Sequence, residues 1–391
     1  MLKLFKEEPK FRFIDKRHFA FVLSGLIILA GVFVFFTRGF NWGIDFSGGT
    51  LIEVSFQEPT SIHQLRSSLA RINLGDAQIT RIGGENKFFI KTLASLKKLN
   101  LDSREKLDDI EEYELVAREI RNGIMSESER AAAAAGKIDL NNTAEGEIAR
   151  FLRDQGVPDE DARESAQLII GLRKSDSGII GDFSELEKAG VKNRVISRLR
   201  SDAFLGRYTF LKVEFVGPQV GKDLRRKAIL ACIWALIGML IYIGFRFKLL
   251  FGLSGILTLA HDVMVALAFI LFFRIEMSLQ VVAALLTIVG YSINDTIVVF
   301  DRLRDNLKIM RKDNLGTILD KTINQTLSRS IFTSVTTLLV VLSLYVFGGE
   351  VIRPMAFTMV VGVIAGSYST IFQSCAWLKV WERFLLKRKK S

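Results

Sequence analysis

The sequence predicts an α-helical polytopic membrane protein with six transmembrane helices and one α+β domain outside the membrane. Hydrophobic residues make up 49% of the 391 positions, and only 5 prolines interrupt them, which suits long helices. Several apolar stretches reach the roughly 20 residues that a transmembrane helix needs. A long polar segment separates the first stretch from the other five. The six predicted spans are Phe19–Phe36, Ala228–Phe245, Leu249–Phe273, Ser278–Phe300, Ser330–Phe347 and Pro354–Leu378.

The distribution of basic residues predicts how the chain is oriented. Lysines and arginines crowd residues 3–17, the stretch after the fourth span and the end of the chain, whereas the opposite short loops hold only Arg274 and Arg353. Both termini should therefore be cytoplasmic. Residues 225–227 are also basic, but the charge rule weakens for long translocated segments. The first span ends in phenylalanines without a small-residue cleavage site, so we expect a retained anchor.

These spans and charges predict five regions. They are a cytoplasmic arm (1–18), transmembrane helix 1 (19–38), a periplasmic α+β domain (39–226), a five-helix transmembrane block (227–379) and a basic cytoplasmic tail (380–391).

The periplasmic segment has the element order βαββαβ of a ferredoxin-like domain. The predicted strands are Thr50–Phe56, Ala77–Ile82, Lys87–Thr92 and Tyr208–Phe215, and the predicted helices are Ser61–Asn73 and Phe183–Ser201. A charged, helix-prone insert at 94–181 should form solvated helices against the small domain. What this insert binds is open.

Ionisable side chains inside the membrane are the main candidates for function. Asp295 lies in the fourth span, where one carboxylate costs roughly 2.5 to 3.5 kcal/mol on insertion scales. Asn294 precedes it, and His261-Asp262 lie near the middle of the third span. Such residues usually face a bundle interior and mark a proton or ion path.

Hydroxyl and glycine side chains follow the same helices. With helical spacing, Thr287, Tyr291, Asn294 and Asp295 share one face of the fourth span. A second stripe along the fifth helix contains Thr326, Arg329, Thr333 and Thr337. In the sixth span, Gly362 and Gly366 form a small-xxx-small pair that permits close helix packing.

Each of these polar residues could instead have a purely structural role. A single hydroxyl usually bonds its own helix, and His261-Asp262 could simply hold two helices together. Arg329 could anchor the membrane boundary, and residues 301–305 are expected to form a solvated turn. The buried carboxylate of Asp295 is harder to explain structurally, because it needs a partner or a proton.

Composition and motifs argue against several other classes. The net charge of +11 is explained by the flanks of the spans, so no nucleic-acid partner is expected. We find no P-loop, nucleophile elbow or zinc motif, and the chain has only three histidines, so we expect neither an enzyme nor a metal or cofactor. The two cysteines fall in apolar spans, which disfavours a disulfide framework.

Five ordered motifs resemble the SecD/SecF family of protein-export membrane proteins, within the resistance-nodulation-division superfamily. The motifs are Gly43–Thr50 (GIDFSGGT), Val216–Gly221 (VGPQVG), His261–Val263 (HDV), Gly290–Arg302 (GYSINDTIVVFDR) and Asn324–Arg329 (NQTLSR). Together they cover both ends of the outer domain and much of the membrane block. The long insert departs from the compact outer domain of the family.

The resemblance implies half of a twelve-span transporter in the bacterial cytoplasmic membrane. It implies SecD, the SecYEG channel and YajC as partners, and use of the proton-motive force to help export polypeptides. Asp295 and Arg329 match the positions of the proton-coupling groups of the family. The residues alone leave open a half-size proton-driven exporter of lipids or small amphiphiles, and a structural scaffold of the translocon. They also leave open whether H⁺ or Na⁺ is the coupling ion, which exported proteins depend on the chain and what the stoichiometry is.

Overall fold

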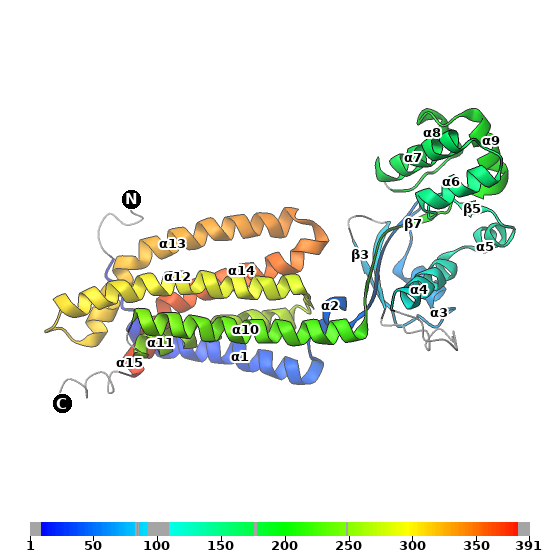
Figure 1. Cartoon of the computed structure of the whole chain (residues 1–391). Helices are drawn as coiled ribbons and strands as arrows, with labels where there is room; N and C mark the ends of the chain where they lie inside the picture. Colours follow the sequence, from blue (N-terminus) through cyan, green and yellow to red (C-terminus); the bar gives the residue numbers. More distant parts are fainter. Residues whose placement is uncertain are drawn as a thin grey trace. The chain divides into compact units, whose positions relative to one another are not determined.

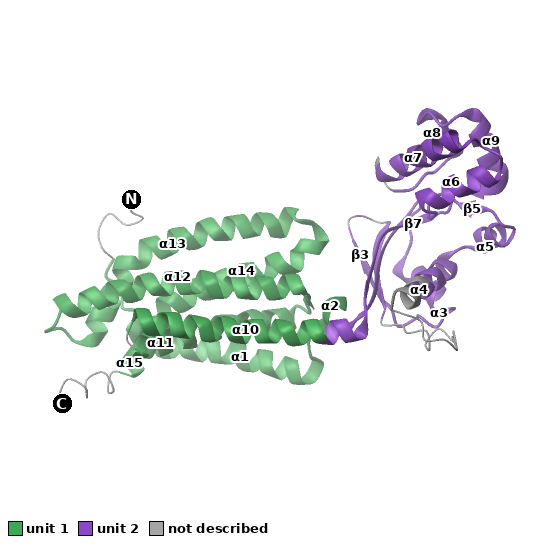
Figure 2. Cartoon of the chain, in the orientation of Figure 1, with its two compact units in different colours: residues 1–46, 223–391 green, residues 47–222 purple. Residues whose placement is uncertain are grey.

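The computed structural model describes residues 9–82, 84, 86–92, 109–175, 178–247 and 249–381. The chain divides into two compact units, which Figure 2 colours separately. Residues 1–46 and 223–391 form one, called here the membrane unit, and residues 47–222 form the other, the α+β unit.

The membrane unit consists of long helices that lie side by side (Figure 1). Among the described residues, six helical segments are long and apolar enough to cross a membrane, in agreement with the six predicted spans. They are α1 (Arg17–Arg38), α10 (Pro218–Arg246), α11 (Leu249–Phe272), α12 (Leu279–Ile309), α13 (Leu315–Phe347), and α14 (Gly349–Phe372) continued by α15 (Ser374–Val380). A 3-10 turn (Ile14–Lys16), a short helix α2 (Ile44–Ser47) and the parallel pair β1 (Asn41–Trp42) and β8 (Glu276–Met277) complete the unit.

Helices α10, α12 and α13 extend well beyond their predicted spans because charged or polar residues continue the helical path. α12 starts after its N-cap Ser278, as predicted, but it runs on to Ile309. The expected solvated turn at 301–305 is therefore wrong. Two ion pairs between residues three apart, Asp301–Arg304 at 2.8 Å and Asp305–Lys308 at 3.4 Å, lie along this extension and favour the helix.

The chain segment before α1 is fastened to α13. The amide of Asn324 accepts a hydrogen bond from the Phe11 N–H (3.1 Å) and donates one to the Phe11 carbonyl (2.8 Å). Close by, the Ile14 N–H donates to Asp320 Oδ1 at 2.9 Å. These bonds satisfy backbone groups of a segment that precedes the first helix.

The α+β unit is built on a four-stranded antiparallel sheet with strand order β3-β4-β2-β7. The strands are β2 (Gly49–Phe56), β3 (Gln78–Arg81), β4 (Lys87–Thr92) and β7 (Tyr208–Val216), close to the predicted ranges. Ile52 of the central strand β2 pairs with Ile90 on one side and Val213 on the other. The ferredoxin-like assignment itself stays a prediction.

Two helices, α3 (Ile62–Ala70) and α4 (Asp109–Ile124), share a core with the sheet. Ser61 caps α3 by accepting a hydrogen bond from the Gln64 N–H, and the Gln64 side chain accepts one from the Ser61 N–H. Helix α3 is shorter than the predicted helix Ser61–Asn73. The second helix that packs on the sheet, α4, comes from the segment assigned to the insert.

The predicted helix Phe183–Ser201 is wrong in two respects. It is two helices, α8 (Phe183–Lys188) and α9 (Asn193–Asp202), because Gly190 adopts φ +91° and ends the first. Both pack away from the sheet core, in a second core with α6 (Glu145–Asp154) and α7 (Asp159–Ser175). Within the predicted insert, residues 94–108, 176 and 177 lie outside the described residues. The described part of the insert contributes α4 to the sheet core and α6 and α7 to the second core. It also contains α5 (Glu127–Ala134) and β5 (Ile138–Asp139), and β5 pairs with β6 (Ala203–Phe204).

Candidate functional site

The first polar cluster of the membrane unit surrounds Asp262 on α11. Its carboxylate is fully buried, with Oδ1 2.9 Å from Nδ1 of His261 and Oδ2 2.5 Å from the hydroxyl of Ser292 on α12. Nε2 of His261 is buried and has no hydrogen-bond partner among the described residues. A buried carboxylate held by a hydroxyl and an imidazole can keep or exchange a proton without leaving its place.

The second cluster joins Asp295 on α12 to Thr333 on α13. The Asp295 side chain is 2% exposed, and the Thr333 hydroxyl lies 3.3 Å from each of its carboxylate oxygens. That hydroxyl also lies within hydrogen-bond distance of the carbonyls of Arg329 and Ser330 on its own helix. One long, shared hydroxyl contact is weak support for a buried charge.

Arg329 lies one helical turn before Thr333 and has an exposed side chain. Its positive charge is near enough to attract the Asp295 carboxylate, although among the described residues the two form no ion pair. The attraction therefore acts at a distance and depends on how α12 and α13 are placed.

A chain of three hydroxyls links α12, α13 and α14. The Tyr291 hydroxyl donates to Ser334 at 3.2 Å, and the Ser367 hydroxyl lies 2.6 Å from the same oxygen. Hydroxyl groups both donate and accept, so such a chain can reorient as a unit.

The remaining sequence-predicted residues are placed differently. Asn294 and Thr287 are exposed, and Thr337 is half-buried. Thr326 is buried but bonds the carbonyls of Thr322 and Ile323 on its own helix. The expected stripe on α12 thus straddles the boundary between the buried and the exposed face.

Gly362 and Gly366 of α14 lie directly against α12. A Cβ at Gly362 would lie 2.1 Å from Cδ1 of Ile288, and one at Gly366 would lie 3.2 Å from Cβ of Ser292 and 3.7 Å from Oδ2 of Asp262. The absence of side chains here lets the backbone of α14 approach the Asp262 cluster.

Sequence reasoning missed three serines, Ser292, Ser334 and Ser367. A signal was available for Ser292, because it lies three residues before Asp295 and therefore on the same side of α12. The other two lie among several neighbouring hydroxyl residues, Ser334 beside Thr333 and Ser367 close to Ser369 and Thr370, so the sequence does not single them out. Within the part of the chain that the structure describes, no group of three or more metal-ligating side chains occurs.

The α+β unit contains a contrasting buried carboxylate, Asp139. Its Oδ1 accepts hydrogen bonds from the N–H groups of Asn141 (2.9 Å) and Gly206 (3.0 Å), and its Oδ2 accepts one from Nδ2 of Asn142 (2.7 Å). Burial raises the pKa of Asp139, and these hydrogen bonds oppose the shift. Burial also lowers the pKa of Arg173, whose charge faces Asp139.

Comparison with known proteins matches both units. The family model for the C-terminal part of the protein export membrane proteins SecD/SecF matches residues 198–383, and the model of the SecD/SecF GG motif matches residues 33–60. That motif includes Gly48, which has φ +71° and lies so close to Pro218 that a Cβ would be 2.8 Å from its Cα. Glycine is therefore required at this position.

Curated relatives align over almost the whole chain. The protein translocase subunit SecF of Koribacter versatilis is 36% identical over 373 residues, which cover 93% of this chain and 88% of the relative. That of Calditerrivibrio nitroreducens is 35% identical over 372 residues, covering 95% and 93%. The crystal structure of SecDF from Thermus thermophilus superposes with a TM-score of 0.64 at 28% identity and covers 97% of this chain. This chain spans 40% of the SecDF chain.

The fold and these relatives define a multi-pass membrane protein with a role in transport. The chain belongs to the SecF family of protein translocase subunits, within the SecD/SecF group.

Proposed function

We propose that this chain works with SecD to use the proton-motive force for export of polypeptides across the bacterial cytoplasmic membrane. Asp295 is the proposed proton acceptor, and Arg329, Asn294, Asp262 and His261 are the proposed supporting groups. The observation that carries the proposal is a carboxylate that is 2% exposed in a membrane helix and that, among the described residues, is supported by one shared hydroxyl. A charge in that position is costly, so uptake and loss of a proton changes the energy of the site strongly.

The proposed step couples this proton to the contact between α12 and α13. When Asp295 is ionised, the charge of Arg329 and the hydroxyl of Thr333 hold α13 toward α12. Protonation removes that attraction and lets the two helices shift. One charge moved through 100 mV supplies about 2.3 kcal/mol. That energy corresponds to a shift of about 50-fold in a two-state population.

A partner subunit is supported by the apolar surface of the membrane unit. α1, α10 and α13 bury little of their surface within this chain and expose large side chains along their length. Because SecDF contains the matched region as 40% of one longer chain, we infer that SecD supplies the other half of a twelve-span heterodimer. SecYEG and YajC are the further proposed partners, and membrane lipids contact the remaining apolar faces.

The proposed orientation places both termini in the cytoplasm and the α+β unit in the periplasm, as the basic flanks indicate. The strand order β3-β4-β2-β7 supports a ferredoxin-like sheet for that unit. In this arrangement the α+β unit meets the exported polypeptide.

Asp295→Asn tests the coupling. In inside-out vesicles that contain this chain as the sole SecF, we expect the variant to lose gradient-driven export while it still assembles with SecD. Asp305→Asn is the matched control, because Asp305 lies on the same helix but is solvent-accessible and paired with Lys308. Export at an unchanged rate in Asp295→Asn would overturn the proposal. Separate H⁺ and Na⁺ gradients in the same vesicles identify the coupling ion.

The same preparation separates the competing functions. Co-purification with SecYEG favours protein export, and co-purification with a periplasmic adaptor favours an exporter of lipids or amphiphiles. A scaffold predicts that SecYEG stability falls when the chain is removed but does not depend on Asp295.

A further inference from the structure

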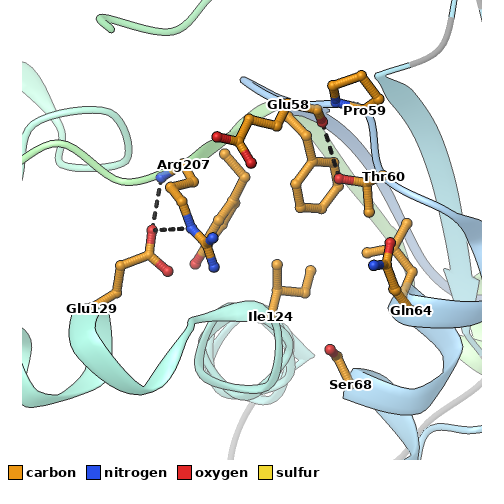
Figure 3. Close-up of a pocket in the computed structure, with 11 residues that line it drawn as sticks. Glu58, Pro59, Thr60, Gln64, Ser68, Ile124, Glu129 and Arg207 are labelled. Atoms are coloured by element: carbon orange, nitrogen blue, oxygen red, sulfur yellow. Dashed lines mark hydrogen bonds and ion pairs between the residues drawn. The ribbon is translucent and has the colours of Figure 1, made fainter. Parts of the chain in front are cut away.

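The α+β unit contains a cavity of about 250 Å³ that the membrane site does not use (Figure 3). It lies between the end of β2, helix α3, the end of α4 and the start of β7. Phe56, Leu65, Ile124 and Tyr208 form its apolar part, and all four belong to or pack on the core of the sheet. This volume is below the range of about 300 to 1,000 Å³ typical of sites for drug-sized ligands. The cavity is suited to one side chain rather than to a whole cofactor.

One positive group faces the cavity. The Arg207 guanidinium points into it, and the side chain is 59% exposed (Figure 3). Its Nε lies 3.9 Å from Glu129 Oε1, and its Nη1 and Nη2 groups have no partner among the described residues. An arginine plane next to aromatic rings is suited to stack on another aromatic ring. The rings of Phe56 and Tyr208, with centroids 6.0 Å apart, line the same cavity.

The carboxylates of the cavity exclude other ligands. Both carboxylate oxygens of Glu129 already accept hydrogen bonds. Oε1 accepts from the backbone N–H of Arg207 (2.7 Å), and Oε2 accepts from the backbone N–H (2.7 Å) and the hydroxyl (2.8 Å) of Ser126. Glu129 is therefore not available for a metal ion. The exposed Glu58 adds a negative charge at the rim, which disfavours a phosphate.

Polar groups at the rim suit an extended backbone. The Glu58 carboxylate can accept a backbone N–H, and the Gln64 side-chain amide, whose oxygen caps α3, retains its NH₂ for a carbonyl. Ser68 projects its hydroxyl from α3 toward the cavity (Figure 3). An unfolded polypeptide offers unpaired N–H and C=O groups on both sides of each side chain.

We propose that this cavity, called here the Arg207 pocket, binds one aromatic side chain of an extended polypeptide together with its flanking amides. The proposal rests on the proposed function and gives it a site of polypeptide contact within this chain. A single pocket of this kind binds weakly and releases readily, which suits a chain that must move onward.

The test uses the full chain in lipid nanodiscs and a labelled 15-residue Gly/Ser peptide with one central phenylalanine. Fluorescence anisotropy should show binding of this peptide and at least tenfold weaker binding, about 1.4 kcal/mol, of the same peptide with serine in the centre. Equal binding of the two peptides, or binding of neither, overturns the proposal.

Two neighbouring serines provide matched variants. Ser68→Trp fills the pocket and should weaken binding of the phenylalanine peptide about tenfold. Ser67→Trp is the control, because Ser67 is exposed on the same helix outside the pocket and should change the affinity by less than about twofold. Equal affinities in two folded variants contradict the assignment.

Arg207→Gln gives a test that does not depend on filling the cavity. The backbone N–H to Glu129 is kept, so the fold should persist, and loss of the guanidinium should weaken binding about threefold. An unchanged affinity here removes the role of Arg207. No gradient is present in these assays, so Asp295→Asn should bind the peptide normally. Failure of the pocket therefore leaves the proton proposal untouched, and the reverse also holds.

Discussion

Asp139 in the α+β unit and Asp295 in the membrane unit are both buried, 7% and 2% exposed, but they are supported very differently. Asp139 accepts three hydrogen bonds of 2.7 to 3.0 Å from two backbone groups and one side-chain amide. Among the described residues, Asp295 has one hydroxyl donor, Thr333 at 3.3 Å, and that hydroxyl is shared with carbonyls of α13. A carboxylate with several fixed donors organises the structure around it. One that lacks such donors stores energy that a proton can release.

The largest expected effect is the difference in stability lost when Asp139 or Asp295 is replaced by alanine. Asp139→Ala leaves three donors without an acceptor, so we expect the α+β unit to lose about 3 to 5 kcal/mol. Asp295→Ala removes a poorly supported buried charge and should change the stability of the membrane unit by less than about 1 kcal/mol. Hydrogen exchange in β7 and α12 measures both. The exposed Asp154→Ala is the control, and equal losses at the two sites would break the comparison.

The next effect tests whether the rigid contact within the membrane unit lies between α12 and α14. Gly362→Ala places a methyl group within about 2 Å of Ile288, so we expect a loss of about 1 to 3 kcal/mol in thermal unfolding in detergent. Gly290→Ala on α12 is the matched control, because nothing lies within 4 Å of its added Cβ. A tolerated Gly362→Ala would mean that α12 and α14 are free to separate.

A smaller effect follows from the raised pKa of Asp139. Between its ordinary pKa of 3.8 and its higher folded-state pKa, the folded chain binds more protons than the unfolded chain. Stability of the α+β unit should therefore fall as pH rises through this window, by at most about 1.4 kcal/mol per pH unit. Hydrogen exchange at a series of pH values measures this, and Asp139→Asn should remove that component. Stability that rises with pH in the wild type because of this residue would contradict the assignment.

The smallest expected change is in Thr333→Val. The hydroxyl contributes one long contact to Asp295, so the free energy of unfolding should change by less than about 1 kcal/mol. Gradient-driven export should nevertheless slow, because the ionised carboxylate loses its only described donor. Thr336→Val is the control, because Thr336 lies three residues further along α13 and its hydroxyl donates to a carbonyl of its own helix. Equal export in the two variants would show that Thr333 does not act on Asp295.

The sequence predicted the elements whose residues carry a strong local signal. The start of α12 matched the predicted start of the fourth span at Ser278, and strand β4 matched its predicted bounds of Lys87–Thr92. The end of α12 was not predictable from hydropathy, because ion pairs rather than apolar residues continue the helix to Ile309. Packing partners were also hidden, since helical periodicity shows that α4 and α9 have an apolar face but not which core that face enters.

The candidate site was predicted in composition but not in geometry. Asp262, Asp295 and Thr333 stood out because polar groups are rare in such helices. The donor to Asp262 proved to be Ser292, and Asn294 points to the exposed face, because a difference of two residues turns a helical side chain by about 200°. Which face is buried depends on the neighbouring helix, and a single sequence does not contain that information.

The two hydrogen bonds between Phe11 and Asn324 have a consequence for biosynthesis. Phe11 and Asn324 are separated by 313 residues, so nearly the entire polypeptide must leave the ribosome before they can meet. During that time the first helix has to stay inserted by its own hydrophobicity. These hydrogen bonds then tie the N-terminal segment to α13, and a chain truncated before residue 324 should keep an N-terminal segment that proteases can cut.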